Sequence, residues 1–278
     1  DNDILPAYTA LACAQRGGLR RRLEKETLSR ARLTAAGGLI RGLLDEGPCQ
    51  NISLMEDREE LLLAYLAQVE RAEPASEDLK TLRQIASAAM ADELDLPRVR
   101  ERALALFDAQ PSRNAVARAM ERGEDFALAA ALGMDWQEPL LAALERDFAK
   151  AHGELNLLLT PEQEPWVDRA LAVCGKNLPR TLAAGPENWS FPPPEEPRYH
   201  WLIYTIQFLK PFPGRGLELV LTALESPVVN NRNMALNVLD SWRESGWTLT
   251  EGAVQALERL KRSEVNDKLR ERLEKEWS

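Results

Sequence analysis

Apolar residues recur every three or four positions along most of this chain, the spacing that places them on one face of a helix. Residues 54–71 show the pattern, with Leu62, Leu66 and Val69 on the same side. Leu, Ala, Glu and Arg, which favour helices, dominate the composition, and residues that favour strands are scarce. The pattern predicts an all-α protein of about twelve helices.

Glycine, proline and capping residues divide this pattern into separate helices. Residues 19–44 predict one long helix, or two that break near Gly37 and Gly38. Pro97 is typical of a first helical turn, because proline has no N–H to leave unpaired there. Residues 139–149 predict a further helix. Residues 198–209 predict a short and almost wholly apolar one, of the kind that is usually buried between neighbours.

The character of the chain changes at residues 186–213. This stretch holds seven of the seventeen prolines and seven of the seventeen aromatic residues. Residues 191–197 cannot supply helical N–H donors, so residues 186–197 predict an irregular but ordered crossover. We expect an acidic N-terminal helical region, 1–185, and a C-terminal region, 186–278, as two domains or as one continuous domain.

A faint repeat follows the crossover. Three apolar positions of one helix match three of a later helix at a spacing of 35 residues, namely Met234, Val238 and Trp242 with Leu269, Leu273 and Trp277. Periods of this size are typical of helical solenoids, in which helix pairs stack and leave a long surface free.

Residues 217–242 resemble a HEAT-type repeat, which pairs two antiparallel helices. The matching positions are a proline in the turn and an Arg-x-x-Ala-x-x-Val-Leu pattern on the second helix, here Pro227, Arg232, Ala235, Val238 and Leu239. Asn231 departs from the family, which commonly has a β-branched apolar residue before the arginine. The resemblance implies a helical-hairpin superhelix, an α-solenoid, at least in the C-terminal part.

Residues 199–214 and 226–242 are also similar to a poorly characterised group of bacterial proteins, some of which are labelled limonene hydroxylase. An oxygen-activating enzyme needs haem, flavin or a non-haem metal. The sequence contains no GxGxxG motif and no Glu-x-x-His pair for a di-iron bundle. We therefore expect no cofactor.

Charge and hydropathy limit the partners. The net charge is −9, and residues 51–200 carry 27 acidic against 16 basic residues. This acidity disfavours nucleic acid and suggests a basic protein or peptide, because complementary charge speeds encounter. The longest apolar run, residues 61–67, is far shorter than a membrane span needs. With no signal peptide visible and three scattered cysteines, we expect a cytoplasmic protein.

Few residues point to catalysis. His152 and His200 are the only two histidines, and neither lies in a spacing typical of metal ligation. Cys13, Cys49 and Cys174 have no adjacent histidine to activate a thiolate. We therefore expect no metal site, and the catalytic residues stay unknown. The sequence favours a non-catalytic function and leaves an enzymatic one open.

The candidate binding residues gather in two places. In the aromatic stretch they are Trp189, Tyr199, His200, Trp201 and Tyr204, and in the repeat they are Asn231 and Arg232. Tyrosine and tryptophan suit binding surfaces, and an Asn/Arg ridge suits a peptide backbone. Packing of the crossover and capping of the helix would explain most of both sets without a binding role.

The leading hypothesis is a non-catalytic protein-interaction module that binds a peptide or partner protein along a concave helical surface. The alternative is an enzyme or small-molecule binder with a pocket at residues 189–212.

Overall fold

The computed structural model describes residues 18–25, 27–44, 57–72, 74–89 and 96–277. These residues form fifteen α-helices and four short 3-10 helices, and no β-strand beyond one isolated bridge. The all-α prediction is confirmed. The helices outnumber the expected twelve partly because Asp147 interrupts the predicted helix 139–149. Its side chain accepts a hydrogen bond from the Lys150 N–H and starts a new helix.

By contacts between residues the chain divides into two compact units, Asp1–Trp136 and Gln137–Ser278. The boundary expected from composition, between residues 185 and 186, lies inside the second unit. Arg180 explains this continuity: its guanidinium donates to Thr222 and Glu225, so it ties the chain before the crossover to the chain after it. Within the described parts of both units, no helix is long and apolar enough to cross a membrane.

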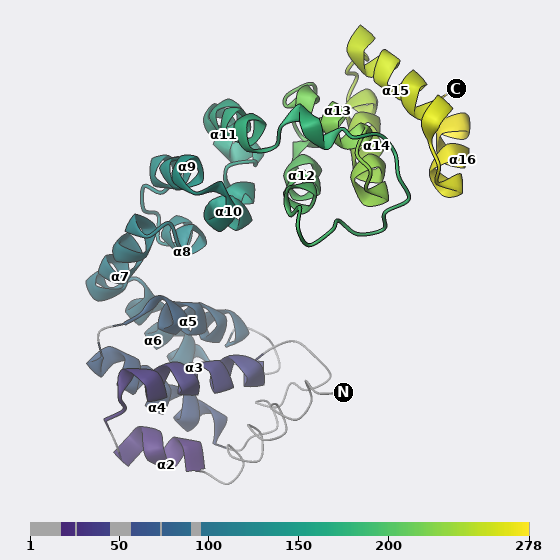
Figure 1. The fold of residues 1–278 in the computed structure, drawn as a ribbon. Coiled ribbons are helices and arrows are strands. Elements are labelled where there is room, and N and C mark those ends of the chain that lie inside the picture. The colour runs from purple at the N-terminus through teal and green to yellow at the C-terminus, as the bar shows by residue number, and fades with distance from the viewer. Residues whose placement is uncertain (1–17, 26, 45–56, 73, 90–95, 278) are drawn as a thin grey trace. The chain divides into compact units, whose positions relative to one another are not determined.

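The described helices of the first unit run in close succession (Figure 1). They are α2 (Gly18–Lys25), α3 (Arg30–Leu44), α4 (Arg58–Arg71), α5 (Ser76–Ala88), α6 (Pro97–Phe107), α7 (Gln110–Glu121) and α8 (Phe126–Ala131). Pro97 begins α6, as expected. Their buried leucine, isoleucine, valine and aromatic side chains form the core of this unit.

The break between α2 and α3 corrects the prediction at Gly37 and Gly38, which both lie within α3. The side chain of Gln68 on α4 stabilises the actual break, because it donates to the Leu23 carbonyl and accepts from the Leu28 N–H. Gly37 has a different role: a Cβ atom there would lie 2.7 Å from the Tyr65 hydroxyl. It allows α3 and α4 to approach closely.

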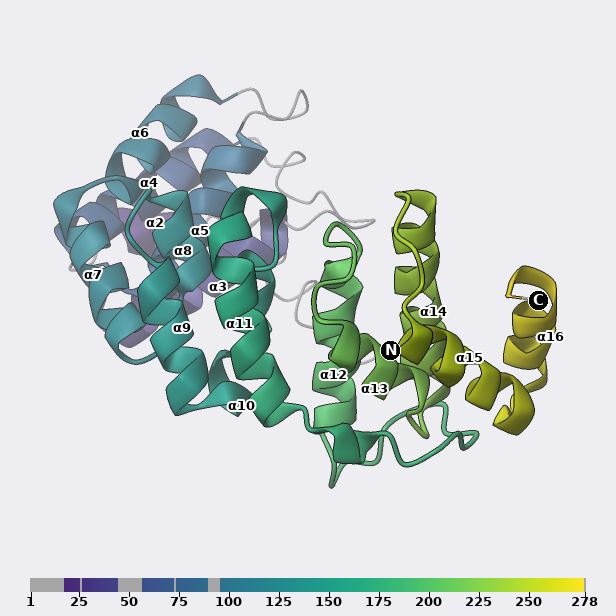
Figure 2. The same cartoon turned by 90° about the horizontal axis from the view of Figure 1, so that it is seen from above.

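The second unit is built from short helices followed by longer helix pairs (Figures 1 and 2). Its α-helices are α9 (Gln137–Arg146), α10 (Phe148–Ala151), α11 (Glu164–Asn177), α12 (Arg198–Ile206), α13 (Leu217–Leu224), α14 (Val229–Glu244), α15 (Glu251–Ser263) and α16 (Asp267–Glu276). The 3-10 helices are η1 (His152–Leu157), η2 (Pro161–Gln163), η3 (Arg180–Leu182) and η4 (Gln207–Leu209).

Helices α12, α13 and α14 contact one another and contribute many of the buried side chains of the second unit. Trp242 on α14 is fully buried, and its indole N–H donates to the Leu209 carbonyl over 2.8 Å. Five of the six matching apolar positions are buried, namely Val238, Trp242, Leu269, Leu273 and Trp277, whereas Met234 is only half-buried. The 35-residue spacing therefore picks out mostly core positions.

Residues 186–197 contain no helix, as expected, and lead into α12. This crossover is ordered by contacts with the start of α14: Trp189 and Val228 form an isolated parallel bridge, and the Val229 N–H donates to the Trp189 carbonyl over 2.9 Å. The Asn230 amide also donates to the Ser190 carbonyl. The loop is thus fixed along its backbone and not only at its ends.

Candidate functional site

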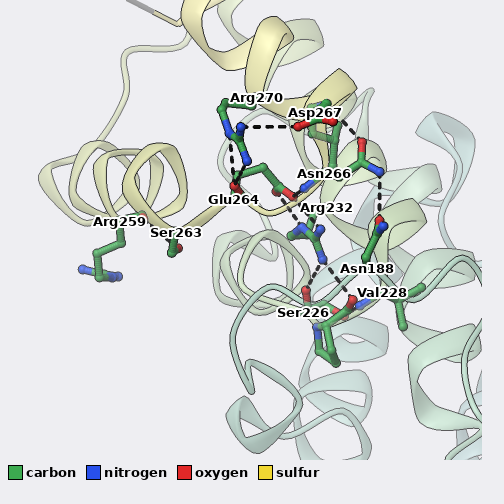
Figure 3. A network of polar contacts seen from close by, with 12 residues as sticks. Asn188, Ser226, Val228, Arg232, Arg259, Ser263, Glu264, Asn266, Asp267 and Arg270 are labelled. Carbon is green, nitrogen blue, oxygen red and sulfur yellow. Dashed lines mark hydrogen bonds and ion pairs between the residues drawn. The ribbon is translucent and has the colours of Figure 1, made fainter.

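The most extensive buried polar network of the second unit centres on Arg232 and Glu264 (Figure 3). Arg232 Nε lies 2.8 Å from Glu264 Oε2, and Nη2 lies 2.7 Å from Oε1. Neither side chain is exposed. Arg232 Nη1 donates to the carbonyls of Ser226 and Pro227, and Glu264 Oε1 also accepts from the Asn266 N–H. The pair joins the turn between α13 and α14 to the turn between α15 and α16.

This burial corrects the expectation of an exposed Asn/Arg ridge. Arg232 directs its guanidinium into the protein, where each of its three nitrogens donates a hydrogen bond. Asn231 is 1% exposed, and its amide donates to the Tyr199 carbonyl and to Ser226 Oγ. Both residues lie in the buried first turn of α14, where they connect neighbouring elements. Neither side chain is exposed at the surface.

Asn266 extends the network to the crossover (Figure 3). Its side-chain oxygen accepts from the Leu269 N–H and caps α16, while its amide donates to Asn188 Oδ1 over 2.9 Å. Asn188 immediately precedes Trp189. One side chain therefore fixes both the start of α16 and the crossover.

Large apolar side chains are exposed around this hydrogen bond. Trp189 is 41% exposed, Phe191 80% and Val265 46%. Trp189 leans edge-on against Tyr199, with ring centroids 6.2 Å apart. We define the crossover junction as residues 186–197, 226–231 and 264–267. Its backbone is fixed by hydrogen bonds, and it carries three of the four large apolar side chains that are exposed in the described second unit.

Trp201 and Tyr204 contact different residues from those that Trp189 contacts. Their rings pack with His152: the His152 and Trp201 centroids are 5.6 Å apart, and those of His152 and Tyr204 are 4.8 Å apart. Phe148 packs against both His152 and Trp201, with ring centroids 5.6 and 5.8 Å away. The Tyr204 hydroxyl donates to the Gly153 carbonyl over 2.9 Å, which ties α12 to η1. These contacts are those of a packed aromatic core that reaches the surface.

His152 is the unusual member of this aromatic cluster. It is 7% exposed, and its buried Nε2 has no hydrogen-bond partner among the described residues. Burial, with a smaller repulsion from His200, lowers the pKa of His152 to about 4. The imidazole is therefore neutral at physiological pH and behaves as a further ring in the packing.

Tyr199 and His200 are neighbours in the sequence but differ in their exposure to solvent. Tyr199 is buried, so the expectation that it faces a groove is corrected; burial also raises the pKa of its hydroxyl. His200 is exposed. Of the expected aromatic set, Trp189 and His200 are the members accessible on the surface, while Trp201 and Tyr204 are half-buried.

The described residues hold no group of three or more His, Cys, Asp or Glu side chains placed to bind a metal ion. Cys174 is buried on α11, and burial raises the pKa of its thiol to about 12. A thiolate nucleophile is strongly disfavoured there. Cys13 and Cys49 lie outside the described residues.

Sequence reasoning missed Glu264 and Phe191. Glu264 lies in the turn between α15 and α16, 32 residues after Arg232, and the repeat spacing offered a signal: an acid about one period after a repeat arginine can pair with it. Phe191 is one of the seven aromatic residues of the 186–213 stretch, but its residue type does not distinguish it from the others. Hydrogen bonds of the backbone and of Asn188 anchor the loop, and Phe191 is exposed.

Comparisons with protein-family models, with curated proteins and with solved structures found no significant match to this chain.

Proposed function

We propose that this chain is a non-catalytic protein-interaction module and that the crossover junction is its contact surface. The observation that carries the proposal is Phe191, a large apolar side chain 80% exposed on a loop whose backbone is fixed nearby. Covering a phenylalanine side chain is worth about 2 kcal/mol, so leaving it in water forgoes that stabilisation. A partner that covers Phe191 regains it.

The fixed backbone strengthens this argument. Binding normally costs free energy to order mobile side chains and loops, and a surface that is already ordered avoids part of that cost. The hydrogen bonds from Val229 and from Asn266 hold residues 188 and 189 in place on either side. The backbone that carries Trp189 and Phe191 is therefore already ordered before a partner binds.

We further propose that the helix pairs α13–α14 and α15–α16 are stacked units of a HEAT-like solenoid, and that a partner lies along the edge of the stack that carries the turns 226–231 and 264–267. The support is the link between equivalent inter-helix turns by Arg232 and Glu264, over a sequence distance of 32 residues. Stacked units contact only their neighbours and leave an extended face for binding. Because Asn231 and Arg232 are used inside the stack, the contact surface is assigned to Trp189, Phe191 and Val265.

Site-specific photocross-linking in the native host tests the proposal. A benzoyl-phenylalanine at position 191 should form a discrete cross-linked product with a protein. The same group at position 254, where Val254 is 44% exposed on α15, serves as the control. The proposal predicts a product from position 191 that position 254 does not give. Identical products from both positions, or none from position 191, would contradict it.

A further inference from the structure

The charge of the crossover junction narrows the class of partner. Residues 186–197 contain three carboxylates and no basic side chain. Glu196 is already paired with Arg198, whose Nε lies 2.6 Å from Glu196 Oε1. Glu187 and Glu195 are exposed and have no ion-pair partner among the described residues. Two carboxylates without an ion-pair partner therefore flank Trp189 and Phe191 along the chain.

The carboxylates of the neighbouring turn, residues 264–267, already form ion pairs within the chain. Glu264 pairs with Arg232, and Asp267 pairs with Arg270 at 3.3 Å. These pairs leave Glu187 and Glu195 as the carboxylates available to a partner. Lys and Arg side chains of a partner would suit this surface for two reasons. They pair with carboxylates, and they pack favourably over aromatic faces.

The extent of the surface argues for a short segment. A standard interface between folded proteins uses roughly 20–30 residues on each side. The crossover junction offers three large exposed apolar side chains, two of them only two residues apart at Trp189 and Phe191. Such a surface matches a few consecutive residues of a linear segment.

We propose that the crossover junction binds a short basic linear segment of a partner protein. One of its large apolar side chains covers Phe191 and Trp189, and its Lys or Arg side chains face Glu187 and Glu195. This inference rests on the proposed function, since it names the partner class of the same surface.

Selection from a displayed library of random 12-residue peptides on the full chain tests the inference. The enriched peptides are then tested on the double variant Trp189→Ser/Phe191→Ser, which takes no part in the selection. Enriched peptides should carry net positive charge and at least one large apolar residue, and should bind the wild-type chain at least tenfold more tightly than the double variant. The change Glu187→Lys/Glu195→Lys should weaken them at least tenfold. The matched changes on α15, Val254→Ser and Glu251→Lys, should leave affinity within about twofold.

The possible outcomes distinguish a failure of the basic-partner inference from a failure of the proposed interaction surface. Peptides that require Trp189 and Phe191 but are neutral or acidic overturn the basic partner and leave the interaction surface standing. Enriched peptides that bind the double variant as well as they bind the wild-type chain overturn both.

Discussion

Arg232 and Glu264 form a bidentate ion pair with no exposed surface on either side chain. Elsewhere in the same unit, Arg169 and Glu138 form another bidentate pair, through Nη1 and Nη2, with both contacts at 2.7 Å. Their side chains are 49% and 63% exposed. Two bidentate pairs that differ in burial allow the effect of burial to be compared.

We predict that Glu264→Gln lowers the free energy of unfolding by about 3–5 kcal/mol, because it leaves the Arg232 charge buried without a counter-charge. Urea unfolding, followed by the loss of helical signal, measures the change. The double variant Arg232→Met/Glu264→Leu should lose less than the single variant, since no buried charge remains.

The matched control is Glu138→Gln, which makes the same chemical change in the exposed pair. We expect it to alter the free energy of unfolding by less than about 1 kcal/mol, as exposed pairs usually do. Equal losses from the two Glu→Gln variants would show that burial of the Arg232–Glu264 pair does not govern its strength.

Gly37 gives a prediction for the first unit. Gly37→Ala should lower the free energy of unfolding by about 1–3 kcal/mol, because the new methyl group would lie 2.7 Å from the buried Tyr65 hydroxyl. Tyr65→Phe removes that oxygen, so the double variant should recover part of the loss. Thermal unfolding of the single and double variants measures this coupling.

Gly38 is the control for Gly37, one residue further along α3. A Cβ atom there meets nothing within 4 Å. Gly38→Ala should therefore stabilise the chain by about 0.5–1 kcal/mol, the usual gain from replacing an exposed helical glycine. The account of α3 is wrong if both alanine substitutions have the same sign.

His152 predicts a pH dependence of stability. Its pKa is about 4 in the folded chain against 6.5 for the free side chain, so between these values the unfolded chain binds the extra proton. The contribution of His152 is complete above pH 6.5 and is lost as the pH falls towards 4. The loss should be on the order of 2 kcal/mol, less than the full pKa shift implies, because the covering Trp201 and Tyr204 rings are only half-buried.

Unfolding measured at several pH values between 7 and 4 tests this prediction. His152→Phe should flatten the difference in stability between these limits, whereas His200→Gln, at the exposed histidine, should keep most of it. A wild-type slope that survives His152→Phe unchanged would assign the pH dependence to other groups.

The sequence predicted helices well where local rules determine them. Pro97 marks the start of α6 and Pro211 follows the end of η4, because proline acts on its own backbone whatever surrounds it. The break between α2 and α3 was misplaced because Gln68, 40 residues beyond Leu28, decides it. No local pattern contains that information.

The candidate site was harder to predict for the same reason. Asn231 and Arg232 have the composition of an exposed ridge, yet Glu264, 32 residues beyond Arg232, makes burial of the arginine favourable. The exposure of Phe191 depends on hydrogen bonds made by Asn188 and Trp189 to distant helices. Both outcomes depend on tertiary contacts. Residue type alone therefore could not distinguish a side chain that anchors the loop from one that is exposed to a partner.

The most direct test of the central claim compares affinity and stability in one variant, Phe191→Ser. Calorimetric titration with peptides selected on the wild-type chain should show binding at least tenfold weaker. The free energy of unfolding should change by less than about 0.5 kcal/mol, as expected for an exposed position. Unchanged binding, or a loss of about 3 kcal/mol or more typical of a core phenylalanine, would contradict the claim that Phe191 is held outward for a partner.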